Sequence, residues 1–249
     1  MISDTLSSII NISREAGNRI MEFYDKPVVE YKADNSPLTQ ADLAAHYLIC
    51  DFLKDNYPEI PVISEESGIP EYGTRKGWDR FWLVDPLDGT KEFISKNGEF
   101  TVNVALIDKN EPVLGVVYAP AKKLMYYAEK GSGSWKQFDA GELVRISSDK
   151  ADPKKPLRVV CSRSHGSDAL EEYLSKFTVE SRIPSGSSLK FCLVADGTAD
   201  LYPRLGPTME WDVAAGDCVY RNSAAKGQHP SELTYNKPSF KNNGFVIGF

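Results

Sequence analysis

The sequence predicts a mixed fold that combines α+β and α/β architecture, and three regions of the chain indicate it. The first 55 residues carry apolar side chains at helical spacing, residues 81–129 form successive strand-like runs, and residues beyond 156 alternate strands with helices. With 249 residues, 41% hydrophobic and 26% charged, the chain can bury a sizeable core. Length alone allows one large domain or two closely packed halves.

Two amphipathic helices are expected first. Between Leu6 and Tyr24, apolar residues recur every three or four positions, so one face of this helix can cover the core. The second helix, residues 40–55, has Thr39 as its N-cap and ends before Pro58.

Strands follow at residues 81–84, 101–107, 113–118 and 124–129, and the short turns between them predict an antiparallel sheet. Residues 147–156 are polar and contain two prolines, so we place a boundary here. The predicted halves are residues 1–150, α+β with the antiparallel sheet, and residues 151–249, α/β. The second half is expected to hold strands near 157–161, 179–183 and 201–203 and helices at 168–177, 189–195 and 211–221.

The segment WLVDPLDGT, residues 82–90, concentrates potential metal ligands. Asp85 and Asp88 lie three residues apart around Pro86, whose fixed φ favours a tight turn. Both carboxylates and the Leu87 carbonyl can therefore point at a common centre, and oxygen-only ligands suit Mg²⁺ better than zinc. An isolated Asp-Gly between strands would instead predict a hairpin turn, so the interpretation depends on the context of this segment.

Two further blocks provide that context. A strand end leads into Glu65-Glu66 upstream, and Trp211-Asp212 is followed by Val-Ala-Ala-Gly downstream. With the glutamate pair, D-P-x-D-G-T and W-D-x-A-A-G in this order, the chain resembles the lithium-sensitive, Mg²⁺-dependent phosphatases of the inositol monophosphatase superfamily. The resemblance covers almost the whole chain. It implies the layered α/β/α/β/α sandwich of inositol monophosphatases and fructose-1,6-bisphosphatases, with the metal site where the two halves meet.

Three stretches resemble the bacterial 3'(2'),5'-bisphosphate nucleotidase branch of this superfamily. They are residues 85–101 (DPLDGTKEFISKNGEFT), 162–165 (SRSH) and 186–204 (GSSLKFCLVADGTADLYPR). The resemblance implies hydrolysis of the 3'-phosphate of adenosine 3',5'-bisphosphate to AMP and phosphate, as a part of sulfur assimilation. The alternatives are a broad inositol- or sugar-phosphate monophosphatase and a non-catalytic sensor of the bisphosphate nucleotide.

The resemblance also implies two Mg²⁺ ions and their ligands. Glu65, Asp85 and the carbonyl of Leu87 are expected at the first ion, and Asp85, Asp88 and Asp212 at the second, so that Asp85 bridges the pair. Glu65 could also reach a third, weaker ion through water. A single acidic residue is usually a solvated surface charge, but four acids in matching context argue against that alternative. Glu66 stays outside this set because its family equivalent is often structural.

Asp42 allows two interpretations. In Thr39-Gln40-Ala41-Asp42 it fits a helix capping box, which the sequence alone favours. The segment also matches the T-x-A-D element of the family, whose aspartate pairs with the threonine of D-G-T. The resemblance therefore implies that Asp42 is the catalytic base and that Thr90 relays a proton to it from the attacking water.

Substrate contacts are expected from two loops. The amides of Gly89 and Thr90 could cradle phosphate oxygens. Ser187, Lys190 and Arg204 could hold a second phosphate or the ribose, although a serine in this place is also an ordinary N-cap. His165 matches a histidine that contacts nucleotide in relatives, whereas a lone histidine is more often structural.

Charge and composition limit the partners. A net charge of −6 argues against binding a nucleic acid polymer, and an anionic substrate could approach the acids only if cations reversed the local charge. The chain contains neither a signal peptide pattern nor an apolar run of membrane-spanning length. We expect a cytoplasmic monomer or homodimer with reduced cysteines, and a peripheral position at the inner membrane stays open. One departure from the family is residues 221–225 (RNSAA), where a turn of small residues is usual.

Overall fold

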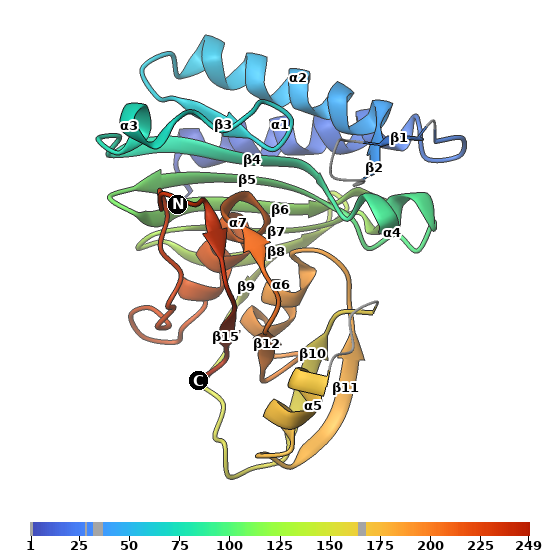
Figure 1. Cartoon of the computed structure of the whole chain (residues 1–249), viewed down its shortest axis with the longest axis vertical. Helices are drawn as coiled ribbons and strands as arrows, with labels where there is room; N and C mark the ends of the chain where they lie inside the picture. Colours follow the sequence, from blue (N-terminus) through green and yellow to red (C-terminus); the bar gives the residue numbers. More distant parts are fainter. Residues whose placement is uncertain (1, 28, 32–36, 164–167) are drawn as a thin grey trace.

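Helices and sheets alternate in five layers (Figure 1). This computed structural model describes residues 2–27, 29–31, 37–163 and 168–249. Helices α1 (Asp4–Met21) and α2 (Gln40–Asn56) cover one face of a seven-stranded sheet, and α6 (Leu189–Ala195) and α7 (Glu210–Arg221) cover the other. A smaller sheet and α5 (Asp168–Leu174) complete the stack. The predicted α/β/α/β/α order is confirmed.

The large sheet has the strand order β3-β4-β5-β6-β7-β8-β9. All neighbouring pairs are antiparallel except β3 and β4, which are parallel. The strands are β3 (Val62–Ser64), β4 (Arg80–Asp88), β5 (Thr101–Asp108), β6 (Glu111–Ala119), β7 (Leu124–Glu129), β8 (Gly133–Phe138) and β9 (Leu143–Ile146). The antiparallel prediction is thus correct for the four strands on which it was based.

The smaller sheet combines a parallel and an antiparallel pair. Strands β10 (Leu157–Cys161) and β11 (Val179–Pro184) run parallel, and β12 (Tyr202–Arg204) runs antiparallel to β15 (Phe245–Ile247). A bridge between Val159 and Leu201 joins the two pairs. The remaining elements are β1 (Val29–Tyr31), β2 (Pro37–Thr39), α3 (Tyr72–Arg75), α4 (Thr90–Ile94), the 3-10 helix η1 (Pro120–Lys122), β13 (Thr208–Met209) and β14 (Lys241–Asn242).

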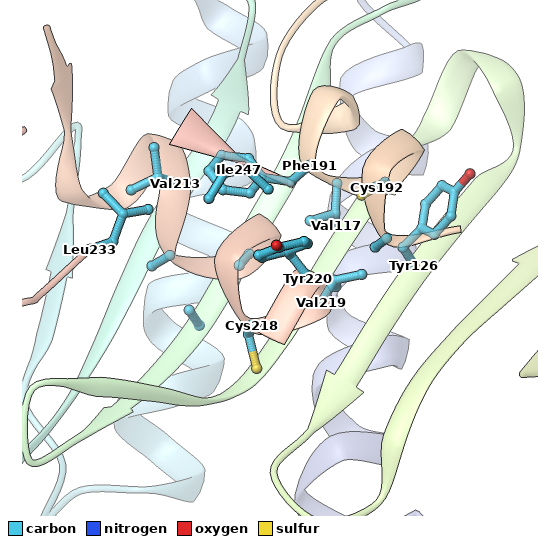
Figure 2. Packing of buried hydrophobic residues seen from close by; sticks show 14 of the residues in the cluster. Val117, Tyr126, Phe191, Cys192, Val213, Cys218, Val219, Tyr220, Leu233 and Ile247 are labelled. Carbon is cyan, nitrogen blue, oxygen red and sulfur yellow. The ribbon is translucent and has the colours of Figure 1, made fainter. Parts of the chain in front are cut away.

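Strand β4 is buried on both faces and separates two hydrophobic cores. Trp82 and Val84 point toward α1 and α2, whereas Phe81 and Leu83 belong to the core shared with α6 and α7. Figure 2 shows this second core, in which side chains of α6 and α7 meet Val117 of the sheet. Burial on both faces explains why β4 reads as a continuous apolar run in the sequence.

Helix α7 lies directly against the sheet because Gly115 of β6 has no side chain. A Cβ at Gly115 would lie 2.7 Å from the Ala215 carbonyl oxygen and 2.7 Å from Cys218 Cβ. This close approach fixes the first turn of α7, and with it Asp212, relative to β4 and β5. In the described part of the chain, no helix is both long and apolar enough to cross a bilayer.

Candidate metal and phosphate site

The end of β4 forms a bulge that carries two of the predicted ligands. Asp85 pairs with Asn103 of β5 and Asp88 pairs with Thr101, so β4 has one residue more than its partner between these pairs. Pro86 has no N–H to contribute to the ladder, which makes a bulge a suitable place for it. The amide of Leu87, the third predicted ligand of this turn, donates to Asp85 Oδ1 at 3.1 Å.

Three acids converge at this bulge from separate elements. Glu65, Asp85 and Asp212 each offer a carboxylate oxygen, and these atoms lie within 4.8 Å of one another. Glu65 follows β3, and its amide donates to the Val84 carbonyl at 3.1 Å, so the parallel pairing of β3 with β4 brings it beside Asp85. Asp212 comes from the first turn of α7.

Three aspartates share one pattern of hydrogen bonds. Asp85 Oδ1 accepts from the Leu87 amide, Asp88 Oδ2 from the Ser188 amide at 2.8 Å, and Asp212 Oδ2 from the Met209 amide at 2.8 Å. Among the described residues, no hydrogen bond reaches the other carboxylate oxygen of any of the three. The chain therefore orients each group through one oxygen and leaves the second for another ligand.

The electrostatics of the site fit a bound cation. Burial, followed by the charge of Glu65 and of Asp88, raises the pKa of Asp85 well above its ordinary value. Burial also raises the pKa of Asp88 to about 6, which Lys190 opposes, and the pKa of Asp212 to about 8, with Asp88 as the next cause. Crowded carboxylates of this kind are stabilised as anions by a divalent ion, and an all-oxygen donor set fits Mg²⁺.

Asp42 caps a helix and also contacts Thr90. Its Oδ2 accepts from the Thr39 amide at 2.8 Å and from the Thr39 hydroxyl at 2.5 Å, which completes the capping box of α2. Its Oδ1 faces the Thr90 hydroxyl, which donates at 3.3 Å. Burial raises the pKa of Asp42 despite these donors. One oxygen thus caps the helix, and the other accepts a hydrogen bond from Thr90.

Gly89 brings the end of β4 against the loop before α6. It adopts φ +93° and ψ 47°, and a Cβ there would lie 2.3 Å from Ser187 Oγ. The Ser187 hydroxyl in turn contacts two main-chain carbonyls, those of Asp88 at 2.8 Å and Glu99 at 2.7 Å. The side chain of Ser187 therefore serves as a link between loops in this structure.

A pocket of about 140 Å³ lies beside the acids, and its lining includes Asp88, Ser187, Lys190, Arg204 and Asp212. The buried Lys190 ammonium donates to the carbonyls of Ser187 at 2.7 Å and Ser185 at 3.4 Å. Burial lowers its pKa, which Asp88 opposes. Arg204 donates from Nη2 to the Pro207 carbonyl at 3.1 Å, and its buried Nε has no hydrogen-bond partner among the described residues. Both cations have N–H groups left for an anion.

His165, the remaining predicted contact, lies outside the described residues. Its neighbour Arg163 binds the buried carboxylate of Glu99 through Nη2 at 2.9 Å and Nε at 3.2 Å. Glu99 Oε2 also accepts from the Gly186 amide at 3.0 Å. Glu99 therefore connects the segment after β10 to the loop before α6.

The sequence interpretation missed Glu99, Asn103 and Ser188. Ser188 donates to Asp88 through its amide, and its hydroxyl contacts both Asp88 Oδ2 and the Asp212 carbonyl. Asn103 Nδ2 reaches Asp88 Oδ2 at 3.5 Å. Nothing in the local pattern distinguishes these residues from an ordinary cap or strand residue. Only the register of β5 and the fold of the loop bring them to the acids.

Comparison with known proteins places the chain among phosphatases. The model of the inositol monophosphatase family matches residues 2–232. The 3'(2'),5'-bisphosphate nucleotidase CysQ of Escherichia coli strain K12 is 51% identical over 251 residues, which cover 97% of this chain and 98% of the relative. The protein of the same name from Haemophilus influenzae is 36% identical and covers 93% of this chain and 87% of its own.

Solved structures agree with this comparison. The crystal structure of CysQ from Bacteroides thetaiotaomicron, a bacterial member of the inositol monophosphatase family, is 42% identical, with a TM-score of 0.81 over 98% of this chain and 96% of its own. An inositol monophosphatase from Thermotoga maritima has a TM-score of 0.77 at 24% identity and covers 99% of this chain and 92% of its own. This second similarity concerns the fold alone.

Proposed function

The chain belongs to the inositol monophosphatase family, and from this premise we infer that it is a 3'(2'),5'-bisphosphate nucleotidase, a phosphatase that removes one phosphate from a bisphosphorylated nucleotide. The finer assignment that we propose is Mg²⁺-dependent hydrolysis of the 3'-phosphate of adenosine 3',5'-bisphosphate to AMP and phosphate. Lithium sensitivity, action in the cytoplasm and a part in sulfur assimilation belong to the same proposal and follow from the resemblance to the nucleotidase branch.

The observation that carries the proposal is the convergence of Glu65, Asp85 and Asp212 on one centre, with Asp88 in the same bulge. We propose two Mg²⁺ ions here, the first held by Glu65, Asp85 and the Leu87 carbonyl and the second by Asp85, Asp88 and Asp212, with room for a third, weaker ion beside Glu65. Divalent ions at these ligands would offset the negative charge of the phosphate and lower the pKa of the attacking water.

Asp42 and Thr90 handle the proton in this mechanism. The attacking water gives a proton to Thr90 Oγ1, and Thr90 gives its own hydroxyl proton to Asp42 Oδ1, with which it is already hydrogen-bonded. Asp42 Oδ2 stays engaged by Thr39, so the accepting oxygen keeps its orientation. Hydrogen bonds of 3.3 Å in the resting state of an enzyme commonly shorten when substrate binds.

The pocket beside the acids supports a substrate with two phosphates. Its cations, Lys190 and Arg204, line the pocket together with Asp88 and Asp212. One phosphate at the metal site and a second near these cations would account for both groups of side chains. The amides of Gly89 and Thr90, and Ser187 and His165, complete the proposed contacts.

The test is phosphate release by the purified protein in Mg²⁺, with adenosine 3',5'-bisphosphate, adenosine 2',5'-bisphosphate, AMP and inositol 1-phosphate offered separately. We expect one equivalent of phosphate and AMP from the 3',5'-bisphosphate and little release from AMP. An Asp85→Asn variant controls for contaminating phosphatase and should be inactive. Faster hydrolysis of inositol 1-phosphate would replace the proposal with the broader monophosphatase, and tight binding without turnover would indicate a sensor.

A further inference from the structure

Asp88 differs from the other two aspartates in what orients it. Asp85 is held by an amide two residues away and Asp212 by an amide three residues away. The donor to Asp88 is Ser188, which lies 100 positions later in the chain and immediately precedes α6. The orientation of this ligand therefore depends on the loop that also lines the substrate pocket.

Ser188 contacts both Asp88 of β4 and Asp212 of α7. Its amide donates to Asp88 Oδ2 at 2.8 Å, and its hydroxyl lies 3.2 Å from the same oxygen and 2.8 Å from the Asp212 carbonyl. Ser188 is 2% exposed, so water does not compete for these contacts. A hydroxyl has a single proton, and the shorter contact makes the Asp212 carbonyl its main acceptor.

We propose that Ser188 is a positioning residue for the second metal site, and that its hydroxyl fixes the start of α7 relative to the β4 bulge so that Asp88 and Asp212 present their free oxygens to one ion. The inference rests on the proposed function, because it concerns the same site. Ser188 itself is not among the proposed metal ligands.

The geometry explains why this task needs a side chain. Asp88 belongs to a strand of the large sheet and Asp212 to a helix packed on that sheet, and Ser188 bonds to both. Its amide alone would orient Asp88, but only the hydroxyl reaches the main chain of Asp212. Groups that orient metal ligands from outside the ligand shell typically change metal affinity by about 10–100-fold when they are removed.

The experiment measures Mg²⁺ binding to the resting protein by calorimetry, without substrate, for the wild type and Ser188→Ala. Ser134→Ala is the matched control, because the Ser134 hydroxyl is also buried and donates to an α7 carbonyl, that of Val219 at 2.6 Å, away from the acids. We expect Ser188→Ala to weaken Mg²⁺ binding about tenfold or more and Ser134→Ala to leave it unchanged. A twofold change in the dissociation constant corresponds to a free energy smaller than RT. The proposal would be overturned if the dissociation constant of Ser188→Ala for Mg²⁺ lay within about twofold of the wild-type value.

A second pair of variants separates the hydroxyl from the shape of the side chain. Thr and Val have the same shape, but only Thr keeps a hydroxyl, so Ser188→Thr should bind Mg²⁺ more tightly than Ser188→Val. Equal affinities of these two variants would contradict a role for the hydroxyl. Because Mg²⁺ binding is measured without turnover, failure of this proposal is distinguishable from failure of the nucleotidase assignment, which the phosphate-release assay decides.

Discussion

At the scale of single residues, two carboxylates of the site, those of Asp42 and Asp212, each cap a helix and also contact other groups of the site. Asp42 caps α2 with one oxygen and faces Thr90 with the other. Asp212 caps α7 with Oδ2, and its carboxylate lies together with those of Glu65 and Asp85. An aspartate at the third position of a helix is thus fixed by the amides that the first turn leaves unpaired. The hydrogen bonds that cap each helix therefore also orient a carboxylate of the candidate site.

Removal of the Thr90 hydroxyl tests the proton path. Thr90→Val keeps the shape of the side chain but cannot pass a proton to Asp42, so we expect kcat to fall by about 10²–10⁴, the usual contribution of general base catalysis. Thr90→Ser keeps the hydroxyl and serves as the control, with activity near that of the wild type. The measurements are kcat and the Mg²⁺ concentration that gives half the maximal rate. This Mg²⁺ concentration should be the same for the variants and the wild type. Equal kcat values for the two variants would exclude Thr90 from the proton path.

The sequence predicted best the acidic residues of the site that lie in family motifs. Glu65, Asp85 and Asp212 meet as the resemblance implies, because acids in matching motifs have few alternative roles. The roles of Ser188 and Glu99 could not be predicted, since serine and glutamate are common surface and capping residues. Their function comes from tertiary contacts with Asp88 and Gly186, which no local pattern encodes.

At the scale of elements, the β4 bulge and the loop before α6 depend on each other. Gly89 ends the bulge in the left-handed region of backbone conformation, and the Ser187 hydroxyl occupies the space where a side chain at residue 89 would project. The same hydroxyl contacts the Asp88 carbonyl. The predicted metal ligands of the bulge and the pocket beside them are therefore built as one unit from two loops far apart in the sequence.

Gly89→Ala tests this close approach. The substitution should cost about 1 kcal/mol for the positive φ and about 1 kcal/mol more for the displaced Ser187 hydrogen bond. Gly131→Ala is the matched control, because Gly131 has φ +85° but no atom within 4 Å of its Cβ position. Urea unfolding should therefore show a larger loss of stability for Gly89→Ala, and its KM for the bisphosphate should rise. If the two variants lose the same free energy of unfolding, the close approach of Gly89 to Ser187 contributes nothing to stability.

The departure from the family at residues 221–225 has a structural explanation. Arg221 donates from Nε to the buried Asp217 at 2.9 Å and from Nη2 to the Leu233 carbonyl at 2.6 Å, and Ala224 bridges to Ser148. The loop after α7 is thus held to the C-terminal segment and to the linker between β9 and β10. The predicted metal ligand Asp212 lies at the other end of α7, away from this loop.

Prediction of elements was best where the pattern was strong. Helix α6 was predicted to the residue, and α2 was predicted to within one residue, because apolar spacing and caps coincide there. Strands β8 and β9 were missed, since most of their residues are exposed or half-buried and lack an apolar alternation. The parallel pairing of β3 with β4 depends on a long connection that no short motif specifies.

At the scale of the whole molecule, the candidate site lies where two chain segments more than 100 residues apart in the sequence, residues 65–88 and α7, pack together. Asp85 comes from the seven-stranded sheet, Glu65 directly follows its strand β3, and Asp212 comes from a helix that covers the sheet. The division into residues 1–150 and 151–249 stays a prediction. The layered order could be predicted because helix and strand periodicities and the family resemblance agree. The distances between acids could not, since they depend on how closely α7 packs at Gly115.

Crowding of acids also makes the stability of the whole protein dependent on pH and metal. The pKa of Asp88 is raised to about 6 and that of Asp212 to about 8, against an ordinary value near 3.8. The folded protein therefore holds more protons than the unfolded chain between these values, so the free energy of unfolding falls as pH rises through about 6 and about 8. Bound Mg²⁺ should cancel this loss, because it stabilises the ionised acids.

The most direct measurement of the central claim is the melting temperature at pH 5.5 and pH 8.5, with chelator or with Mg²⁺. We predict that the chelated protein melts lower at pH 8.5, by roughly 4–8 °C if the acids cost about 2 kcal/mol, and that Mg²⁺ restores stability mainly at the higher pH. Asp212→Asn, which can still cap α7, should lose most of this response. A melting temperature that Mg²⁺ leaves unchanged at both pH values would contradict the account that these acids form one metal site.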